Sequence, residues 1–272
     1  MKIILSRKGL DSSAGGKPSP ILRNGQIFSI PIPTTDKNSP YRYRDVFVNN
    51  INASDMLSIV GAKKLHANTA CHFDPLLNLD IGLFGQAGNA QRELDNLGVG
   101  EGDLFLFFGW FRDFHSVRKA DYHHIFGWLQ VDQVIKGTVE IKKFCEFYKI
   151  LHPHACADAH SFKYNTLFVS HQKSTLKCLD LDIKSHGLFA QTNNKLILTE
   201  PGRSRSNWHM PEKYFSPSLN PKLFETRLKW STPNSNRICC RGYGQEFVMD
   251  SLRNPSIKDW ARDLFLNSKI VE

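Results

Sequence analysis

Two strands without a polar face constrain the fold most. Residues 104–111 read LFLFFGWF directly after the glycine-rich turn GVGEGD, and residues 123–131 read HHIFGWLQV. A strand on the surface of a sheet alternates apolar and polar residues, whereas a strand that is apolar throughout is covered on both faces or borders a ligand cleft. The sequence therefore predicts that these two strands lie in the core or along a cleft, joined by the polar, hairpin-like connection 112–122.

Further strands are predicted around this pair from short apolar or alternating runs. They lie at 2–6, 26–33, 165–170 and 195–199, and the prolines at 31 and 33 should cut the second of them off. Strands outnumber helices in this interpretation. The chain is therefore predicted to be an α+β protein with a mixed or antiparallel sheet, a PUA-like, barrel-like core and flanking helices.

Three helices are predicted, the first of them short, near 53–60, with Ser54 or Asp55 as its N-cap. The second covers 83–98, where Gly98 supplies the C-terminal stop and one stripe is formed by Ala87, Ala90, Leu94 and Leu97. The third lies in the tail NPSIKDWARDLFLNS, where Ser256 and Asp259 have the spacing of a capping box. Its inward-facing residues are predicted to be Ile257, Trp260, Ala261 and Leu264.

The length of the chain bounds its organisation. A chain of 272 residues can bury a large core as one domain or as two fused lobes. We expect one domain over 1–272, with an N-terminal lobe 1–80 packed on a barrel-like core 81–272 as the alternative division.

Charge favours a polyanionic partner. The formal net charge is +9, and the cations are spread out, as in RYR (42–44), RSRS (203–206) and KDWAR (258–262). A basic tail would concentrate them, so this distribution indicates a groove or pocket for a phosphate-bearing ligand. We expect nucleic acid or a nucleotide as the partner.

The sequence predicts no membrane association. It has no apolar run long enough to span a bilayer, and MKII is followed at once by polar residues, so we expect no signal-peptide core. Its six cysteines are scattered without a CxxC pair, which predicts free thiols rather than a zinc knuckle. A cytoplasmic location is the expectation.

The opening loop GLDSSAGGKPSP (9–20), with Arg7 and Lys8 beside it, is a candidate anion site. Its glycines allow backbone N–H groups to turn toward an anion, Arg7 and Lys8 add positive charge, and Asp11 and Ser12 follow closely. The loop is not a P-loop, because Pro18 stands after Lys17 where Ser or Thr is needed. The alternative is a rigid connector that uses Gly and Pro for shape alone.

A histidine and an aspartate two residues apart suggest a metal site. An extended backbone points His72 and Asp74 to the same side, and one distant histidine would complete the two-His, one-carboxylate set of non-haem iron enzymes. The candidates for the distal ligand are His123, His124, His152, His154 and His160. We therefore predict a divalent metal, Fe or Zn, as the cofactor. The alternative is a polar pair without a metal.

Aromatic and polar residues elsewhere could hold a base. Trp110 and Trp128 each follow a glycine, and with Phe107, Phe108, Phe111 and Arg112 they could stack a base or simply form core. In CCRGYGQEFVMD (239–250), Arg241 supplies charge, Gln245 could read a base edge, and Glu246 could act as a general base.

Several blocks recur in order over almost the whole chain and together resemble the nucleotide modification associated domain 3 family. They are KIILSRKGLDSSAGGKPSPIL, HFDP, FGQAGNAQ, GVGEGDLFLFFGWF, HIFGWLQV, HPH, NTLFV and RGYGQEFVMD. The resemblance implies a role in modifying nucleic-acid bases, with motif positions at Arg7, Asp11, His72, Asp74, Gln86, Trp110, Arg112, His124, His152, His154, Arg241, Gln245 and Glu246. The cation-rich connection 112–122 departs from the family pattern.

The middle of the chain is also similar, more faintly, to PUA-like barrels of the ASCH and EVE type, in which a Gly-Asp turn feeds a strand that lines a cleft for a modified base.

These features predict an enzyme that modifies a nucleotide or DNA base. The aromatic cleft and Gln86 would hold the base, the opening loop and Arg241 would hold the phosphate, and His72, Asp74, His154 and Glu246 would carry the chemistry. One alternative is a non-catalytic PUA-like reader of modified bases. Another is an iron-dependent oxidase that acts on a small molecule or peptide, with the basic charge incidental.

Overall fold

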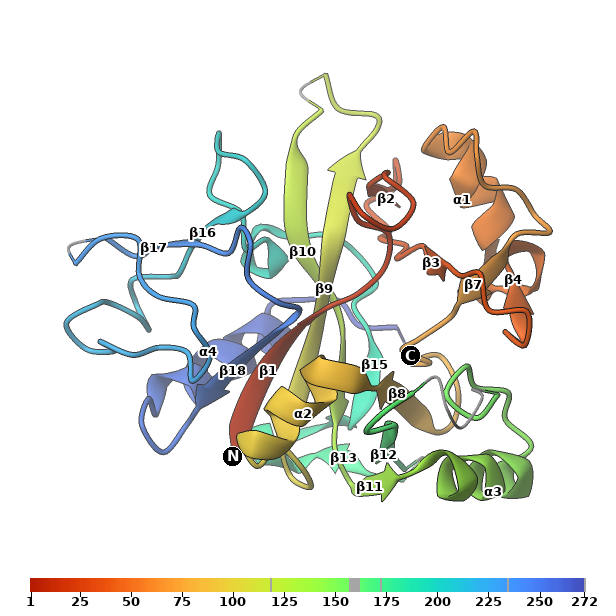
Figure 1. Cartoon of the computed structure of the whole chain (residues 1–272). Coiled ribbons are helices and arrows are strands. Elements are labelled where there is room, and N and C mark those ends of the chain that lie inside the picture. The colour runs from red at the N-terminus through yellow and green to blue at the C-terminus, as the bar shows by residue number, and fades with distance from the viewer. Residues whose placement is uncertain (118, 157–161, 172, 234, 272) are drawn as a thin grey trace.

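One mixed sheet of six strands forms the centre of the computed structural model (Figure 1). Its middle strands, β9 (Leu104–Asp113) and β10 (Asp121–Gln130), are the predicted apolar strands and pair antiparallel. β1 (Lys2–Arg7) runs parallel to β9 on its other side. The remaining strands of the sheet are β18 (Glu246–Asp250), β15 (His186–Leu188) and β2 (Ser19–Ile21). The structure describes residues 1–117, 119–156, 162–171, 173–233 and 235–271.

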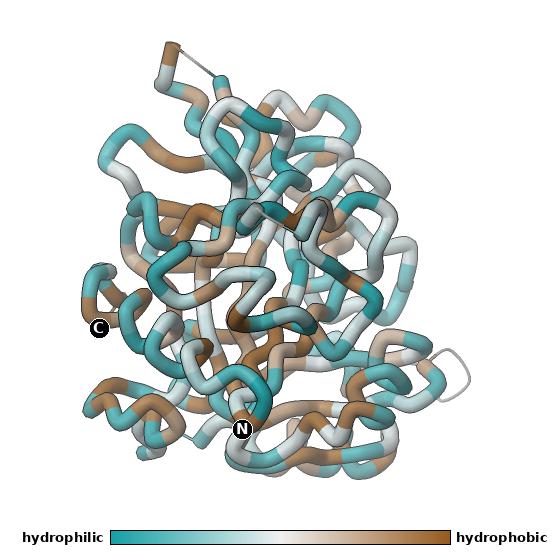
Figure 2. Tube along the Cα trace, turned by 90° about the vertical axis from the view of Figure 1, so that its left-hand side faces the viewer, coloured by the Kyte–Doolittle hydropathy of each residue, from teal (hydrophilic) through white to brown (hydrophobic). Residues whose placement is uncertain are grey.

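The two apolar strands are buried, as predicted. Leu104 through Phe108 are fully covered, and Trp128 in β10 is 1% exposed. The indole of Trp128 packs against Phe189 and Phe265, and its Nε1–H donates to the carbonyl of Lys184 at 3.0 Å. Trp128 is therefore a core residue. Figure 2 shows the hydropathy along the trace, with hydrophobic strands inside and mostly hydrophilic outer loops.

The fold is α+β with mixed and antiparallel sheets, which confirms the predicted class. The order of the main sheet is β15–β10–β9–β1–β18, with β2 attached to β9. Among the described residues, no strand pairing joins the β15 edge to the β18 edge. The barrel-like core therefore stays a prediction.

A second sheet corrects the predicted helix 83–98. Residues 82–86 form β8 (Gly82–Gln86), which pairs with β12 (Thr166–Ser170), itself paired with β11 (Gln133–Lys136). The helix α2 starts only at Gly88 and covers Gly88–Asn96. Leu83 and Phe84 are fully buried, so pairing with β12 overrides the helical pattern. Gly98, with φ at +62°, does end the helix as predicted.

The N-terminal part has its own small sheet and hydrophobic cluster. β7 (Ala70–His72) lies between β3 (Ile32–Pro33) and β4 (Tyr41–Arg42), at the right of Figure 1. The cluster beneath this sheet extends from Leu10 to Cys71. The strand predicted at 26–33 is reduced to Ile32–Pro33, and before it Gln26 and Ile27 make only isolated bridges. The division into lobes 1–80 and 81–272 stays a prediction.

The helices α1 (Ala53–Ile59) and α4 (Ser256–Leu266) were predicted correctly, but their caps were not. The N-cap of α1 is Asn52, whose side chain accepts from the backbone N–H of Ser54 at 2.9 Å. α4 follows Pro255 without a side-chain cap, so the predicted capping box is wrong. The inward residues of α4 are confirmed as buried. The helix α3 (Thr138–Tyr148) was not predicted.

The strand predicted at 195–199 is wrong. A short 3-10 helix, η3 (Asn194–Leu196), occupies its start, and Ile197 and Thr199 make only isolated bridges. The other short elements are η1 (Tyr43–Asp45), β5 (Phe47–Val48), β6 (Ile51–Asn52), β13 (Thr175–Leu176), η2 (Lys177–Leu179), β14 (Leu181–Lys184), β16 (Asn207–His209) and β17 (Arg237–Cys239).

The six cysteines are free, as predicted. In the described part of the chain, no helix combines the length and the apolar composition that crossing a bilayer needs.

Candidate functional site

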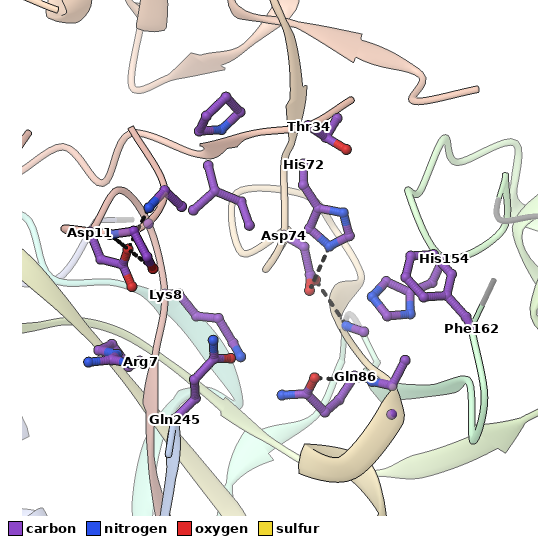
Figure 3. A pocket seen from close by; sticks show the side chains of 18 of the residues that line it. Arg7, Lys8, Asp11, Thr34, His72, Asp74, Gln86, His154, Phe162 and Gln245 are labelled. Carbon is purple, nitrogen blue, oxygen red and sulfur yellow. Dashed lines mark hydrogen bonds and ion pairs between the residues drawn. The ribbon is translucent and has the colours of Figure 1, made fainter. Parts of the chain in front are cut away.

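A pocket of ≈ 630 Å³ opens between the end of β1, the small sheet around β7, and β8 (Figure 3). This volume lies in the usual range for ligand sites, about 300–1,000 Å³. Eight residues predicted from the sequence line it: Arg7, Lys8, Asp11, His72, Asp74, Gln86, His154 and Gln245. The structure therefore brings segments far apart in the sequence to one cavity.

Two histidines and one carboxylate converge on one wall of this pocket. Single ligand atoms of His72, Asp74 and His154 all lie within 4.8 Å of one another. His72 ends β7, Asp74 follows it by two residues, and His154 comes from the turn after α3. Of the four candidates for the distal histidine that the structure describes, His154 is the one in this cluster.

The carboxylate of Asp74 is held in a fixed, ionised state. Its Oδ1 accepts from the backbone N–H of Gly85 at 2.9 Å and lies 3.2 Å from His152 Nε2, and its Oδ2 lies 3.8 Å from His72 Nε2. Burial alone would raise the pKa of Asp74, but the hydrogen bond from His152 and the nearby imidazole of His72 outweigh it, so the pKa lies well below its ordinary value. Asp74 thus offers an anionic oxygen.

The tautomer of His154 follows from its neighbour Asn165. The Asn165 amide donates to the carbonyl of His154 at 3.0 Å, so its Oδ1 faces His154 Nδ1, 2.6 Å away. His154 Nδ1 must therefore carry the proton, which leaves a lone pair on Nε2. Burial lowers the pKa of His154 to about 3 despite the charge of Asp74, so the ring is neutral at physiological pH.

His152 orients Asp74 instead of facing the pocket. Its Nδ1 accepts the backbone N–H of His154 at 3.2 Å, so its Nε2 carries the proton that it donates to Asp74. Both ring nitrogens are used, and the side chain is fully buried. A neutral histidine has one donor and one acceptor nitrogen, and both have hydrogen-bond partners here.

The other predicted histidines lie elsewhere. His124 is buried, with Nδ1 2.6 Å from the Ile125 carbonyl and Nε2 2.9 Å from Thr192 Oγ1. His123 Nδ1 accepts from Trp208 Nε1 at 2.9 Å. Neither belongs to the His72–Asp74–His154 cluster. His160 lies outside the described residues.

Glu246 lies behind the pocket and forms hydrogen bonds with two lining residues, Lys8 and Gln86. Its Oε1 accepts from Ser6 Oγ at 3.0 Å, Lys8 Nζ at 3.0 Å and Gln86 Nε2 at 2.6 Å. Glu246 is 3% exposed and does not line the main pocket. In this position it neutralises Lys8 and fixes the Gln86 amide, whose oxygen accepts from the Ala87 N–H.

The opening loop bonds mainly to itself. Asp11 Oδ1 accepts from the backbone N–H groups of Ser13 and Ala14, each at 2.8 Å, and from Ser13 Oγ. The N–H of Gly16 donates to the Asp11 carbonyl. The loop amides thus serve the turn, and the loop contributes Arg7, Lys8 and Asp11 to the pocket as side chains. Ser12 lies outside the pocket and bonds to Arg205.

The predicted aromatic cleft is not part of this pocket. Trp110 stacks with the Arg205 guanidinium at 4.0 Å, and Arg112 forms an ion pair with Asp121 at 2.7 Å. Arg241 lies on an exposed turn outside the lining. The aromatic side chain that does line the pocket is Phe162, stacked on His154 with ring centroids 4.9 Å apart.

The family model for nucleotide modification associated domain 3 matches residues 2–250. The chain belongs to this family. No curated protein and no solved structure matches the chain. All the residues that line the pocket lie within the segment that the nucleotide modification associated domain 3 model covers.

Sequence reasoning missed several residues of this nucleotide modification associated domain 3 pocket. Phe162, Lys163 and Thr34 line it, Asn165 orients His154, and Gly85 lies against the His154 ring. Only Gly85 carried a usable signal, since an isolated glycine in a strand marks a close approach of another group. The incorrect helix at 83–98 hid it.

The role of Asn165 can be tested by metal titration. Asn165→Ala removes the acceptor that fixes the His154 tautomer, so we expect metal affinity at the cluster to fall by about 10–100-fold. Asn24→Ala, in an exposed turn, is the control. Wild-type affinity in Asn165→Ala would show that the amide does not orient the ring.

Proposed function

We propose that this chain is an enzyme that modifies a nucleotide base at a divalent metal ion bound by His72, Asp74 and His154. The observation that carries the proposal is the convergence of these three side chains within 4.8 Å on the wall of a ligand-sized pocket. The family supports a role in nucleotide modification.

The donor set suits a catalytic metal. Two neutral imidazoles and one carboxylate leave coordination positions open for substrate or water, as in non-haem iron and in catalytic zinc sites. A bound metal would supply Lewis-acid or redox chemistry there. The chain prepares the site beforehand, because Asp74 is ionised, His154 is neutral and Phe162 covers the His154 ring.

Other lining residues can orient the base. Gln245 is exposed, and its carboxamide makes no hydrogen bond among the described residues, so it can present a donor and an acceptor to a base edge. A base taken from a duplex must first be unstacked at a cost of a few kcal/mol. Stacking on Phe162 would offset part of this cost, in place of the tryptophans expected from the sequence.

Metal analysis of protein purified without oxygen tests the proposal. We expect about one iron or zinc ion per chain, because three ligands fix a catalytic site. His72→Ala should lose most of it, whereas His209→Ala, at an exposed histidine far from the cluster in sequence, should keep it. Equal metal content in both variants, or none in the wild type, would refute the metal site.

Each of two alternative functions would differ from this enzyme in one measurable property. A non-catalytic PUA-like reader would bind a modified oligonucleotide in the same pocket without consuming it. An iron-dependent oxidase of small molecules or peptides would hold iron but have no affinity for nucleotides. The partly buried cluster of potential metal ligands favours an enzyme over the reader, since a reader needs the pocket but not the histidines.

A further inference from the structure

The two adjacent cations at the end of β1 differ in their partners. Lys8 forms an ion pair with Glu246 at 3.0 Å and lies over the ring of Phe84. Arg7 has no ion pair within 4.0 Å and no side-chain hydrogen bond among the described residues. Its Nε is buried without an acceptor. Arg7 and the exposed Lys163 both line the pocket without an ion pair among the described residues, and Arg7 is the one of these two whose side chain has a buried, unpaired N–H.

An unpaired, buried N–H of a charged group is costly, on the order of 1–3 kcal/mol or more. Arg7 is nevertheless fixed in place, since its backbone N–H donates to the carbonyl of Gln245 at 2.9 Å and it pairs with Phe108 in β9. Such a group at the wall of a pocket is satisfied when a ligand brings an anion to it.

A second guanidinium, that of Arg205, lies near Arg7 but outside the lining of the pocket. Arg205 stacks on Trp110 and donates to Ser12 of the opening loop. Burial lowers the pKa of Arg205, and the charge of Arg7 acts in the same direction, while the carboxylates of Asp121 and Asp11 oppose the shift. An anion bound close to two guanidinium groups reduces the electrostatic repulsion between them.

Two carboxylates also lie near this corner, and both have other partners. Asp121 pairs with Arg112 at 2.7 Å. Asp11 Oδ1 accepts three bonds from its own loop, and Asp11 makes no ion pair with Arg7 within 4.0 Å. Neither carboxylate supplies the acceptor that the Arg7 Nε lacks.

The metal-ligand cluster lies on the opposite side of the same cavity, as Figure 3 shows for Arg7 on the left and His72 and His154 on the right. A ligand in the pocket thus meets the fixed, unpaired guanidinium of Arg7 at one end and the candidate metal ligands at the other, where the exposed Lys163 adds positive charge. This arrangement fits a molecule whose anionic group is remote from the atom that reacts.

We infer that Arg7, assisted by Arg205, binds the phosphate of the substrate, so that the substrate is a phosphorylated nucleotide and not a free base or nucleoside. This inference rests on the proposed function for the identity of the base-bearing ligand. It assigns the phosphate to these two side chains, in place of the loop amides and Arg241 expected from the sequence.

Calorimetric titration tests the inference with four kinds of probe. They are inorganic phosphate, the four deoxynucleosides, their 5′-monophosphates, and a mixed-sequence single strand of about ten nucleotides, a length typical of single-strand binding sites. We expect at least one monophosphate to bind about tenfold or more tighter than its nucleoside, as charge-assisted hydrogen bonds imply. A single strand that binds tighter than every monophosphate would support the same contact and identify the phosphate as one within a polynucleotide.

Variants show whether Arg7 is responsible. Arg7→Gln should remove the preference for phosphate and leave nucleoside affinity and metal content at wild-type values, and it should not lower thermal stability, because the guanidinium has no hydrogen-bond partner to lose. Arg205→Gln should reduce the preference in part, and Arg23→Gln, on an exposed turn, should not change it. A preference that survives in Arg7→Gln, or equal affinity of the wild type for nucleosides and monophosphates, would overturn the inference. Metal content, measured on the same samples, reports separately on the proposed function.

Discussion

Gly85→Ala is expected to abolish metal binding at the His72–Asp74–His154 cluster. A Cβ at residue 85 would overlap the imidazole of His154, with Nε2 only 2.6 Å away. The ring cannot move aside easily, because Phe162 stacks on it and Asn165 bonds to its Nδ1. Displacing His154 removes one ligand, and shifting β8 also weakens the bond from the Gly85 N–H to Asp74.

The measurement is a metal titration of the refolded or native variant, combined with urea unfolding. We expect metal affinity to fall by more than about a hundredfold, beyond the usual effect of a residue that only orients a ligand. Overpacking should lower the free energy of unfolding by about 1–3 kcal/mol. Gly100→Ala is the matched control, since a Cβ there meets open space. Wild-type metal affinity in Gly85→Ala would mean that His154 is not a ligand.

Glu246→Ala is expected to lower the free energy of unfolding by about 3–5 kcal/mol, the usual effect of breaking a buried ion pair. The change leaves the ammonium of Lys8, which is 11% exposed, without its counter-charge. It also removes the acceptor for Ser6 Oγ and Gln86 Nε2. Because Lys8 and Gln86 line the pocket, Glu246→Ala should weaken ligand binding as well as lower stability.

Urea unfolding of three variants checks this expectation. Glu246→Gln keeps an acceptor and the shape of the side chain, so it should destabilise less than Glu246→Ala. Glu212→Ala, at a side chain 80% exposed, should leave stability unchanged. A Glu246→Ala protein within about 0.5 kcal/mol of the wild type, the range of ordinary surface changes, would show that Lys8 does not depend on this carboxylate.

Local patterns in the sequence predicted the features that depend on local chemistry. The continuous apolar runs became β9 and β10, because such residues must be covered on both faces. The H-x-D spacing placed His72 and Asp74 together at the end of β7, as an extended backbone requires. The helix at 53–60 and the stop at Gly98 were predicted for the same reason.

The rest depends on contacts between distant segments, which spacing does not encode. Residues 83–86 have a helical stripe but form a strand, because β12 pairs with them. His152 and His154 are two residues apart and look alike in the sequence, yet Asn165 leaves His154 a free Nε2 while Asp74 engages His152. Arg7 and Lys8 are neighbours in the sequence, but only Lys8 has a counter-charge. That counter-charge is Glu246, which lies 238 residues later in the sequence.

β1 pairs with β18, which is synthesised much later, so one end of the pocket is completed after the other. The three candidate metal ligands and the amide that orients His154 all precede β12, so a ribosome has delivered them by the time that strand emerges. The other end of the cavity needs Gln245 and Glu246, which are translated after β12. If the proposed function is right, we therefore expect the ligand set of the proposed metal site to be synthesised before the residues expected to contact the nucleotide.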